Sequence, residues 1–245
     1  MNRLHGPGFL HLSWRWLVML CSALLLHACQ EAPAPDDYFP LQDGLSWTYQ
    51  VNIDLLNRQQ TSRFRIENIG TVTIDDTLLH VRRTSDQTDY YILKTDHALY
   101  RWGKRTAVEY QPRRDDPQRQ IMPLPPSTDS RLWTSLTHPY TFRQTLPTEE
   151  SLTEKIQLEM AYNVVDMEAE ITVPAGTFQH CLLIRGEGEF SMYVDPKDGY
   201  QTIEVTTREW YAPGVGLVKL ERNEPIDTHA FKGGRIVMEL VEKDF

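Results

Sequence analysis

Hydrophobic and polar side chains alternate along much of this chain. Between residues 47 and 55, Trp47, Tyr49, Val51, Ile53 and Leu55 are separated by single polar residues. Because successive side chains of a strand point to opposite faces, this period of two predicts a β-strand with one buried and one solvated face. The same reasoning predicts further strands at residues 62–69, 78–84, 89–94, 98–102, 156–173, 178–190, 202–211, 217–221 and 235–241.

Helical patterning is nearly absent from the sequence. Residues 149–160 fit a short amphipathic helix, and they fit a strand equally well. About ten strands joined by short turns are typical of an antiparallel all-β protein. We therefore expect an all-β fold made of a single antiparallel domain, either a strongly curved sheet or a partly open barrel.

The segment from residue 165 to 184 allows a prediction of register. Residues 174–177, Pro-Ala-Gly-Thr, read as a four-residue turn, which would pair Val173 with Phe178 and Asp166 with Arg185. Most hydrophobic residues of the two strands then meet on one face, and opposite charges meet on the other. A slip of one residue would instead turn Cys181 toward the core.

A proline-rich segment interrupts the pattern between residues 111 and 130. It contains five prolines and the charged run Arg-Arg-Asp-Asp at 113–116. Proline cannot donate a ladder hydrogen bond, so neither a central strand nor a regular helix is expected here. The segment is either a long surface loop or a link between two halves of the sheet. Its apolar residues Ile121, Met122 and Leu124 are candidate contacts for a partner protein, and a solvated excursion without function is the alternative.

The first 28 residues have the organisation of a secretion signal. Arg3 and Arg15 are present without any acidic residue, and an apolar run extends from Trp16 to Leu26. As a helix these eleven residues would reach about 16 Å, roughly half of a bilayer's hydrocarbon core, so a transmembrane span is not expected. A cleaved signal peptide is the better interpretation.

The residues that follow, Leu26-His27-Ala28-Cys29, resemble the bacterial lipobox. The resemblance implies cleavage before Cys29, which would carry a diacylglyceryl thioether and an amide-linked acyl chain such as palmitate. Gln30 stands at the next position, where an aspartate would retain the lipoprotein at the inner membrane. The same resemblance therefore implies anchoring at the outer membrane, on its periplasmic face. An ordinary secretory signal with a chance cysteine is the alternative.

These features divide the chain into three parts. Residues 1–28 form the lipoprotein signal peptide, residues 29–37 an acylated cysteine with a proline-rich tether, and residues 38–245 a periplasmic β domain. A tether of this composition favours an extended conformation and would span on the order of 25 Å. The domain is thus expected to stay close to the membrane surface.

Three cysteines occur, and they agree with lipidation. Cys21 lies in the removed signal and Cys29 would be acylated, which leaves Cys181 alone. An intramolecular disulfide is then excluded in an oxidising compartment. We expect Cys181 to pack as a small hydrophobe within a strand, with a reactive thiol as the alternative.

Composition narrows the class of partner. The chain has 40% hydrophobic and 24% charged residues, as in globular proteins, and a net charge of -9. This acidic balance gives no electrostatic reason to expect nucleic acid or anionic lipid headgroups as the main partner. The expected partners are the membrane, reached through the lipid anchor, and another envelope protein, while the oligomeric state stays open.

Motifs for catalysis or cofactor binding are weak. The sequence contains no HExxH, no CxxC and no Gly-x-Ser-x-Gly, so no metal, cofactor or enzymatic activity is expected. Glu187 and Glu189, with Arg185, share a strand face and could form a glycosidase-like acid pair, but alternating charges on a solvated face are commoner. Residues 213–216, Pro-Gly-Val-Gly, read as a hairpin turn and not as a phosphate-binding loop.

Three segments resemble short sequence motifs found in a broad group of uncharacterised β-rich envelope lipoproteins. They are residues 38–41, 173–178 and 211–219, which read Tyr-Phe-Pro-Leu, Val-Pro-Ala-Gly-Thr-Phe and Tyr-Ala-Pro-Gly-Val-Gly-Leu-Val-Lys. The resemblance implies a single β-rich domain and supplies neither a biochemical function nor catalytic residues. The leading hypothesis is therefore a membrane-anchored lipoprotein with a non-catalytic binding or assembly role. The alternatives are a carrier of an acyl chain or lipoprotein in a cavity inside the sheet, and an envelope hydrolase.

Overall fold

The computed structural model describes residues 33–55, 58–140, 156–228 and 232–245. The expected signal peptide, the lipobox with Cys29 and the first residues of the tether lie outside these ranges. From Ala32 to Phe245 the chain forms one compact unit.

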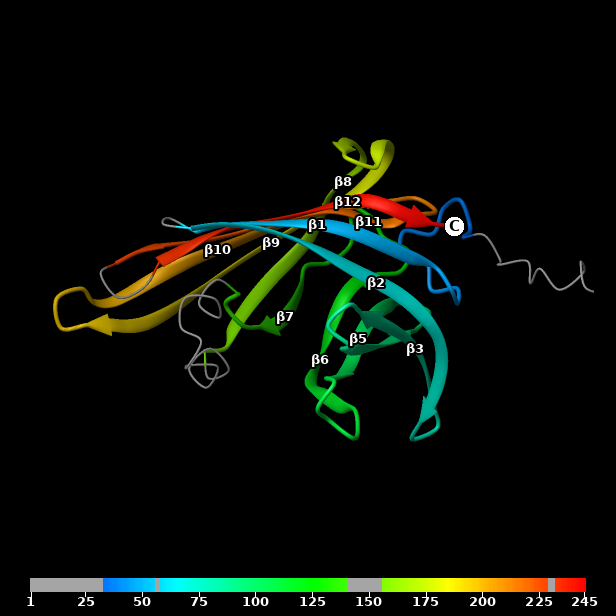
Figure 1. Cartoon of the computed structure of the whole chain (residues 1–245), viewed down its shortest axis with the longest axis horizontal. Helices are drawn as coiled ribbons and strands as arrows, with labels where there is room; N and C mark the ends of the chain where they lie inside the picture. The colour runs from blue at the N-terminus through cyan, green and yellow to red at the C-terminus, as the bar shows by residue number, and fades with distance from the viewer. Residues whose placement is uncertain (1–32, 56–57, 141–155, 229–231) are drawn as a thin grey trace, which may run out of the picture. The chain divides into compact units, whose positions relative to one another are not determined.

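Twelve antiparallel strands make up the described part of this unit, all in one sheet (Figure 1). They are β1 (Ser46–Leu55), β2 (Arg58–Ile74), β3 (Thr77–Thr84), β4 (Asp89–Lys94), β5 (Ala98–Arg105), β6 (Arg113–Pro123), β7 (Trp133–Thr137), β8 (Leu158–Val173), β9 (Gly176–Asp195), β10 (Gly199–Ala212), β11 (Gly216–Asp227) and β12 (Lys232–Asp244). The described residues contain no helix, so the all-β expectation is confirmed. None of them, accordingly, forms a helix long and apolar enough to cross a membrane.

The strand order makes the sheet curl until its edges meet. Strands that are neighbours in sequence pair with each other, except β6 and β7, and β1 also pairs with β12. The two edge strands are therefore β6 and β7. The hydroxyl of Ser135 on β7 donates a 2.9 Å hydrogen bond to the carbonyl of Gln120 on β6. No strand ladder joins β6 to β7 in the part of the chain described. The result is the expected partly open barrel, and we call the boundary between β6 and β7 the seam.

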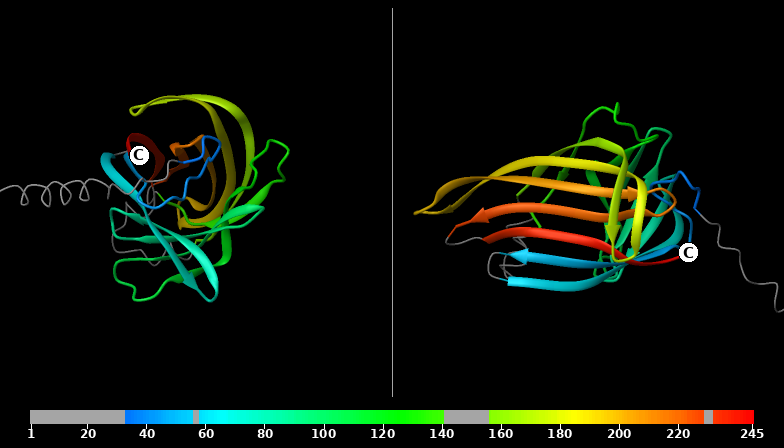
Figure 2. Two further views of the ribbon diagram at one scale, coloured as in Figure 1. Left: turned by 90° about the vertical axis from the view of Figure 1, so that its right-hand side faces the viewer. Right: turned by 90° about the horizontal axis from the view of Figure 1, so that it is seen from above.

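The segment before β1 ties the two halves of the sheet together. The carbonyl of Pro40 accepts hydrogen bonds from Asn68 on β2, at 3.1 Å, and from Arg82 on β3, at 2.7 Å. The carbonyl of Asp37 accepts a 2.9 Å bond from the amide of Gly214, in the turn between β10 and β11. This N-terminal segment therefore lies inside the arch of strands visible in the left view of Figure 2.

The main hydrophobic core fills the inner face of the sheet. Its fully buried members are Leu158, Met160, Leu182, Ile184, Ile203 and Val205 from β8, β9 and β10, with Leu99 and Met122 from β5 and β6. Each such side chain contributes roughly 1.5–3 kcal/mol through its burial. A second cluster surrounds Trp47 and Tyr49, whose polar atoms donate to the carbonyls of Val215 and Leu217. The alternation seen in β1 thus reflects real burial.

The predicted register of β8 and β9 is wrong. Val173 pairs with Gly176, so the turn has two residues instead of four, and Asp166 lies opposite Leu183. His180 adopts a φ of 54°, and the register shifts between Ala169 and Ile171, which are the marks of a bulge. A two-residue hairpin suits the twist of the strands better than the four-residue turn inferred from the Pro-Ala-Gly-Thr pattern.

Cys181 is buried as a consequence of this register. It pairs with Ala169, is fully inaccessible to solvent and packs in the second cluster as a free thiol. Burial raises the pKa of the thiol to about 11. The prediction of a packed hydrophobe is confirmed.

The proline-rich segment forms β6 and the connection to β7. As an edge strand, β6 pairs only with β5 and so tolerates Pro117 and Pro123. The exclusion of a central strand is confirmed. Neither alternative foresaw an edge strand, and only residues 124–132 form a connection, which leads from β6 to β7. Sequence patterning missed both β6 and β7 as strands.

The expected partner strip does not form an exposed surface. Met122 is fully buried in the main core, and Ile121 and Leu124 are half-buried against it. These apolar residues therefore pack the end of the edge strand against the main core. Met122 is therefore inaccessible to a partner in this structure, whereas the role of Ile121 and Leu124 as partner contacts stays a prediction.

Two smaller expectations have clear outcomes. Residues 213–215 form the turn between β10 and β11, where Gly214 has a φ of 67°, so the hairpin interpretation is confirmed. The ambiguous stretch 149–160 ends in β8, which begins at Leu158, and its first seven residues lie outside the described ranges.

Candidate functional site

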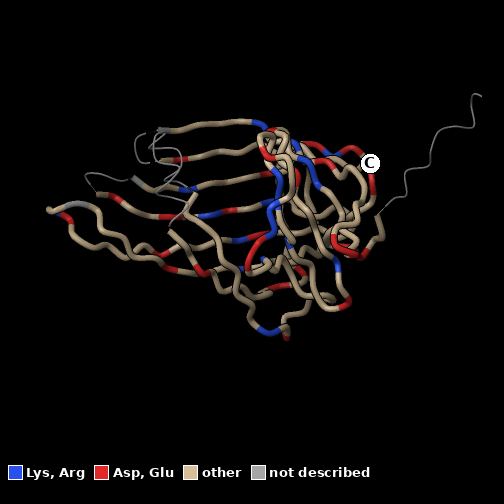
Figure 3. Tube along the Cα trace, turned by 90° about the horizontal axis from the view of Figure 1, so that it is seen from below, with Lys and Arg blue, Asp and Glu red and all other residues tan. Residues whose placement is uncertain are grey.

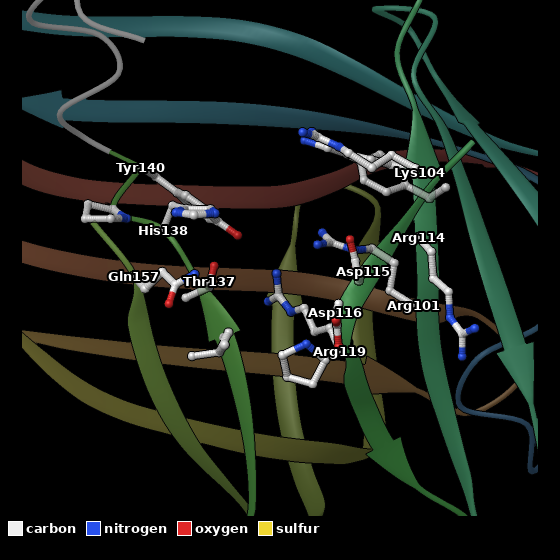
Figure 4. Close-up of a pocket in the computed structure, with 15 residues that line it drawn as sticks. Arg101, Lys104, Arg114, Asp115, Asp116, Arg119, Thr137, His138, Tyr140 and Gln157 are labelled. Carbon is white, nitrogen blue, oxygen red and sulfur yellow. The ribbon is translucent and has the colours of Figure 1, made fainter. Parts of the chain in front are cut away.

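A cavity of about 620 Å³ opens at the seam. One wall comes from β4, β5 and β6, and the other from β7, residues 138–140 and Gln157, which immediately precedes β8. Figure 4 shows the two groups of side chains facing each other across the opening. Because the strand ladder is interrupted here, side chains rather than backbone line the space. We call this cavity the seam cleft.

The seam cleft is strongly basic. Its lining includes five cationic side chains against two carboxylates, Asp115 and Asp116: the cations are Arg101, Lys104, Arg113, Arg114 and Arg119. Positive charge is therefore concentrated here in a chain whose net charge is -9. In Figure 3 basic positions gather in the middle of the view. A concave site lined by one sign of charge raises the local concentration of ligands of the opposite sign.

Aromatic rings and carboxylates hold the arginines of β5 and β6 in place. Arg101 donates from Nε to Asp115 at 2.5 Å, and its guanidinium lies 5.8 Å from the ring centre of Tyr90. The guanidinium of Arg114 lies 5.8 Å from the ring centre of Trp102. Such contacts reduce the conformational entropy that a flexible arginine would lose on binding a ligand.

Tyr140 forms the opposite wall and meets two arginines. Arg119 hydrogen-bonds to its phenol, and the guanidinium carbon of Arg222 lies 4.1 Å from the centre of its ring. Burial raises the pKa of Tyr140, but the positive charges of Arg119 and Arg222, with hydrogen bonds from Arg119 and Thr137, outweigh it and lower the pKa to about 7. The phenol therefore ionises within the physiological range.

A buried ion pair on β11 holds this wall in position. Arg222 donates to Glu224 at 2.6 Å, and both side chains are almost completely buried. Both carboxylate oxygens of Glu224 accept from the backbone amide of Tyr140 at 2.9 Å, and Arg222 also donates to the carbonyl of His138 at 3.3 Å. Residues 138–140 are thus fixed against the barrel interior by β11.

A second cavity, of about 420 Å³, has its charges neutralised internally. It lies over β1, β2, β11 and β12. Lys219 pairs with Glu221 and with Glu239 at 3.1 Å each, and Arg235 pairs with Glu221 at 2.9 Å. The seam cleft, with its excess of cations, is therefore the better candidate for a ligand site.

The acid pair considered from the sequence lies elsewhere. Glu187 and Glu189 are exposed on β9, and Glu187 forms an ion pair with Arg185 on the same face. Neither glutamate lines the seam cleft. Within the described ranges, no group of three or more His, Cys, Asp or Glu side chains could hold a metal ion. Cys29, the predicted lipidation site, lies outside these ranges.

Sequence reasoning missed most of the seam cleft. The only signal in the sequence was the run Arg113-Arg114-Asp115-Asp116, which places four charged side chains together within the proline-rich segment. Arg101 and Tyr140 gave no comparable signal. Their proximity depends on the pairing of β5 with β6 and on the approach of the two sheet edges.

Comparisons with known proteins give a partial match to a family and a likeness to two solved structures. Residues 141–227 match a family model described as DUF3108-like. No curated protein matches the chain. A presumed lipoprotein from Parabacteroides distasonis is 16% identical, with a TM-score of 0.46, and the match covers 88% of this chain and all of that one. A presumed exported protein with a YmcC-like fold, from Bacteroides fragilis, is 13% identical, with a TM-score of 0.42, and the match covers 84% of this chain and 98% of that one.

Proposed function

We propose that this protein is a lipid-anchored lipoprotein of the bacterial envelope that acts by binding a ligand or partner at the seam cleft, without catalysis. The lipobox-like residues 26–29 support the anchor, and Gln30 supports the periplasmic face of the outer membrane as its location. The observation that carries the binding role is the seam cleft itself, a basic cavity at the one interruption of the sheet ladder in the described residues.

The structure of the tether's end supports a domain held close to the bilayer. Residues 34–37 turn back on themselves, with a 3.0 Å hydrogen bond from the amide of Asp37 to the carbonyl of Ala34, and Asp37 is bonded to Gly214. Five residue steps separate Cys29 from Ala34, which span at most about 18 Å when fully extended. This limit is shorter than the 25 Å estimated for the whole tether, because its last residues belong to the domain.

The lining of the seam cleft favours binding over the two alternatives. Its volume suits a small ligand, but charged side chains line it and the main core fills the inner face of the sheet, so an acyl chain is not favoured. Asp115 is engaged by Arg101, and the ring of His138 is bonded to the carbonyl of Ile156 at 3.0 Å. Asp115 and His138, which a hydrolase could use as acid or base, are thus engaged in structural contacts.

Labelling with a fatty acid tests the anchor. Cells that express the wild type or Cys29→Ser are grown with labelled palmitate and fractionated. We expect label and membrane association for the wild type only. In denaturant, the acylated chain should show a single reactive thiol, that of Cys181, and a Cys181→Ala variant should show none. An unlabelled wild type, or two thiols per mature chain, would refute the anchor.

Crosslinking in living cells tests the binding role separately. A photoreactive residue at Gln157, which lines the seam cleft, is compared with one at Leu78, which is exposed on β3. We expect a specific adduct from position 157 and none from position 78. Equal labelling at both positions, or none at 157, would exclude the seam cleft as the binding site.

A further inference from the structure

The charge of the seam cleft specifies the charge of its ligand. Five cations and two aspartates leave an excess of three positive charges in the lining. Glu109, which lies 3.8 Å from Arg113, reduces this excess, and the partly ionised phenol of Tyr140 reduces it further. A phosphate monoester carries a charge of about -1.5 to -2 near neutral pH, whereas a carboxylate or a phosphate diester carries one charge. Because the lining keeps a net positive charge, it attracts a dianion more strongly than a singly charged anion.

Arg119 supplies hydrogen-bond donors inside the seam cleft. Its partner is the phenol of Tyr140, and none of the described carboxylates forms an ion pair with it. Glu209 is near enough to influence it electrostatically but is hydrogen-bonded to the hydroxyl of Tyr211 at 2.5 Å. A guanidinium has five N–H donors in a planar fork, so donors remain for a ligand. Figure 4 shows Arg119 between the two walls of the cleft.

The arrangement of the arginines by depth fits one phosphate group with a small substituent. Arg101 and Arg119 are half-buried, whereas Arg113 and Arg114 are exposed. A phosphate held by the inner pair would leave its substituent between the exposed arginines and solvent. Bidentate arginine contacts are the strongest and most specific way to bind phosphate oxygens. An extended polyanion is disfavoured because the rest of the chain is acidic.

We propose that the seam cleft binds a phosphate monoester group, with Arg101 and Arg119 as its inner contacts and Arg113 and Arg114 at its rim. This inference rests on the proposed binding role of the cleft and names the chemical class of its ligand. The group could belong to a soluble phosphate ester or to a lipid headgroup, and both sources offer the same chemistry.

Calorimetry on the purified full-length protein in non-ionic detergent tests the proposal. Glycerol 3-phosphate is the soluble probe, dihexanoyl phosphatidic acid is the lipid probe, and dimethyl phosphate is the singly charged control. We expect a monoester to bind and dimethyl phosphate to bind at least about tenfold more weakly. Preference for glycerol 3-phosphate identifies a soluble source, and preference for phosphatidic acid a lipid source.

Variants separate recognition from folding. Arg119→Gln removes the inner contact, but it also removes a partner of Tyr140. The double change Arg113→Gln with Arg114→Gln alters exposed side chains. Loss of their contacts with Glu109 and Trp102 should lower the unfolding midpoint only slightly. We expect the double change to weaken monoester binding about tenfold, while Arg185→Gln on the exposed face of β9, which makes the same type of change, has no effect.

Three results would overturn the phosphate assignment. They are failure of both monoesters to bind, equal binding of dimethyl phosphate, and an equal loss of affinity in Arg185→Gln. If position 157 still yields an adduct in cells under any of these results, the binding role stands and only the ligand class is wrong.

Discussion

Tyr140 is the residue at which the two walls of the seam cleft are coupled electrostatically. It receives a hydrogen bond from Arg119 on β6, lies under Arg222 from β11, and is held through its backbone amide by Glu224. Two strands distant in sequence, β6 and β11, thus determine the protonation of one phenol. Its ionisation reduces the positive charge of the cleft, so we expect ligand affinity to be sensitive to pH near neutrality.

Replacement of Tyr140 tests this electrostatic coupling. The pKa of its phenol is about 7 in the folded state and about 10 when unfolded, so folding favours the ionised form. Its contribution to stability is complete above the unfolded pKa and is lost as the pH falls through the folded value. We expect the stability advantage of the wild type over Tyr140→Phe to grow between about pH 7 and pH 9, measured by urea denaturation.

A spectroscopic titration provides an independent check of the same prediction. Tyrosinate absorbance of the folded wild type should show one early step near neutral pH, which Tyr140→Phe abolishes. Tyr110→Phe is the matched control, because Tyr110 is 99% exposed. An early step that persists in Tyr140→Phe would assign the low pKa to another tyrosine.

At the residue scale, the sequence predicted the packing role of some residues but not which residues form the seam cleft. Cys181 was recognisable as a packing residue, because a lone cysteine within an apolar strand pattern has no partner for other chemistry. Arg119 and Tyr140 were not recognisable as a pair. Arginine and tyrosine are common on protein surfaces. Only the proximity of these two side chains in the folded structure identifies them as an interacting pair.

At the scale of elements, the edge strands decide where the seam cleft forms. β6 contains prolines that limit pairing to one side, and β7 has only five residues. Consequently the two edges approach without a backbone ladder, and the hydroxyl of Ser135 bridges them. Short or proline-containing edges also protect a sheet from pairing with other chains.

Removal of the bridging hydroxyl should weaken the seam. Ser135 is 4% exposed, so Ser135→Ala leaves the carbonyl of Gln120 without this partner in a buried setting. We expect the free energy of unfolding to fall by about 1 kcal/mol, measured by denaturant titration. Thr134→Ala, at the exposed neighbouring position, should change stability by less than about 0.5 kcal/mol. Equal effects of the two changes would argue against a specific hydrogen bond at the seam.

The positions of the long strands could be predicted from the sequence, but the register in which they pair could not. Regular alternation identified β1 and β8 to β10, because it repeats over many residues. The predicted register of β8 with β9 failed first at the turn, which has two residues, and again at His180, where a bulged residue shifts the following side chains by one position. β6 escaped notice because its prolines and charges are those of a loop.

At the scale of the whole molecule, the sheet is continuous from β6 through β1 and β12 to β7. The pairing of β1 with β12 joins the first half of the chain to the second, and Pro40 and Asp37 add hydrogen bonds to both halves. Neither half of the chain therefore forms a separate sheet, because the two halves share the β1–β12 ladder. This arrangement predicts one cooperative unit.

Hydrogen exchange in denaturant tests this cooperativity. The most protected amides of β3 and β4 should open with the same free energy as those of β10 and β11, because both sets require rupture of the common sheet. Mass spectrometry of peptides from each half, across a urea series, measures the two values. Loss of protection in β3 and β4 at clearly lower urea would show that the halves unfold separately.

The period of two in the sequence determined the all-β class, most strands and the burial of residues such as Trp47, because side-chain direction along a strand is a local property. The tertiary structure alone decided the register of β8 and β9, the place of the proline-rich strand at an edge and the existence of the seam cleft. Those features arise where residues far apart in the chain meet, as Tyr140 and Glu224 do across 84 positions. A contact over that distance depends on how the whole sheet curves, and no local pattern encodes it.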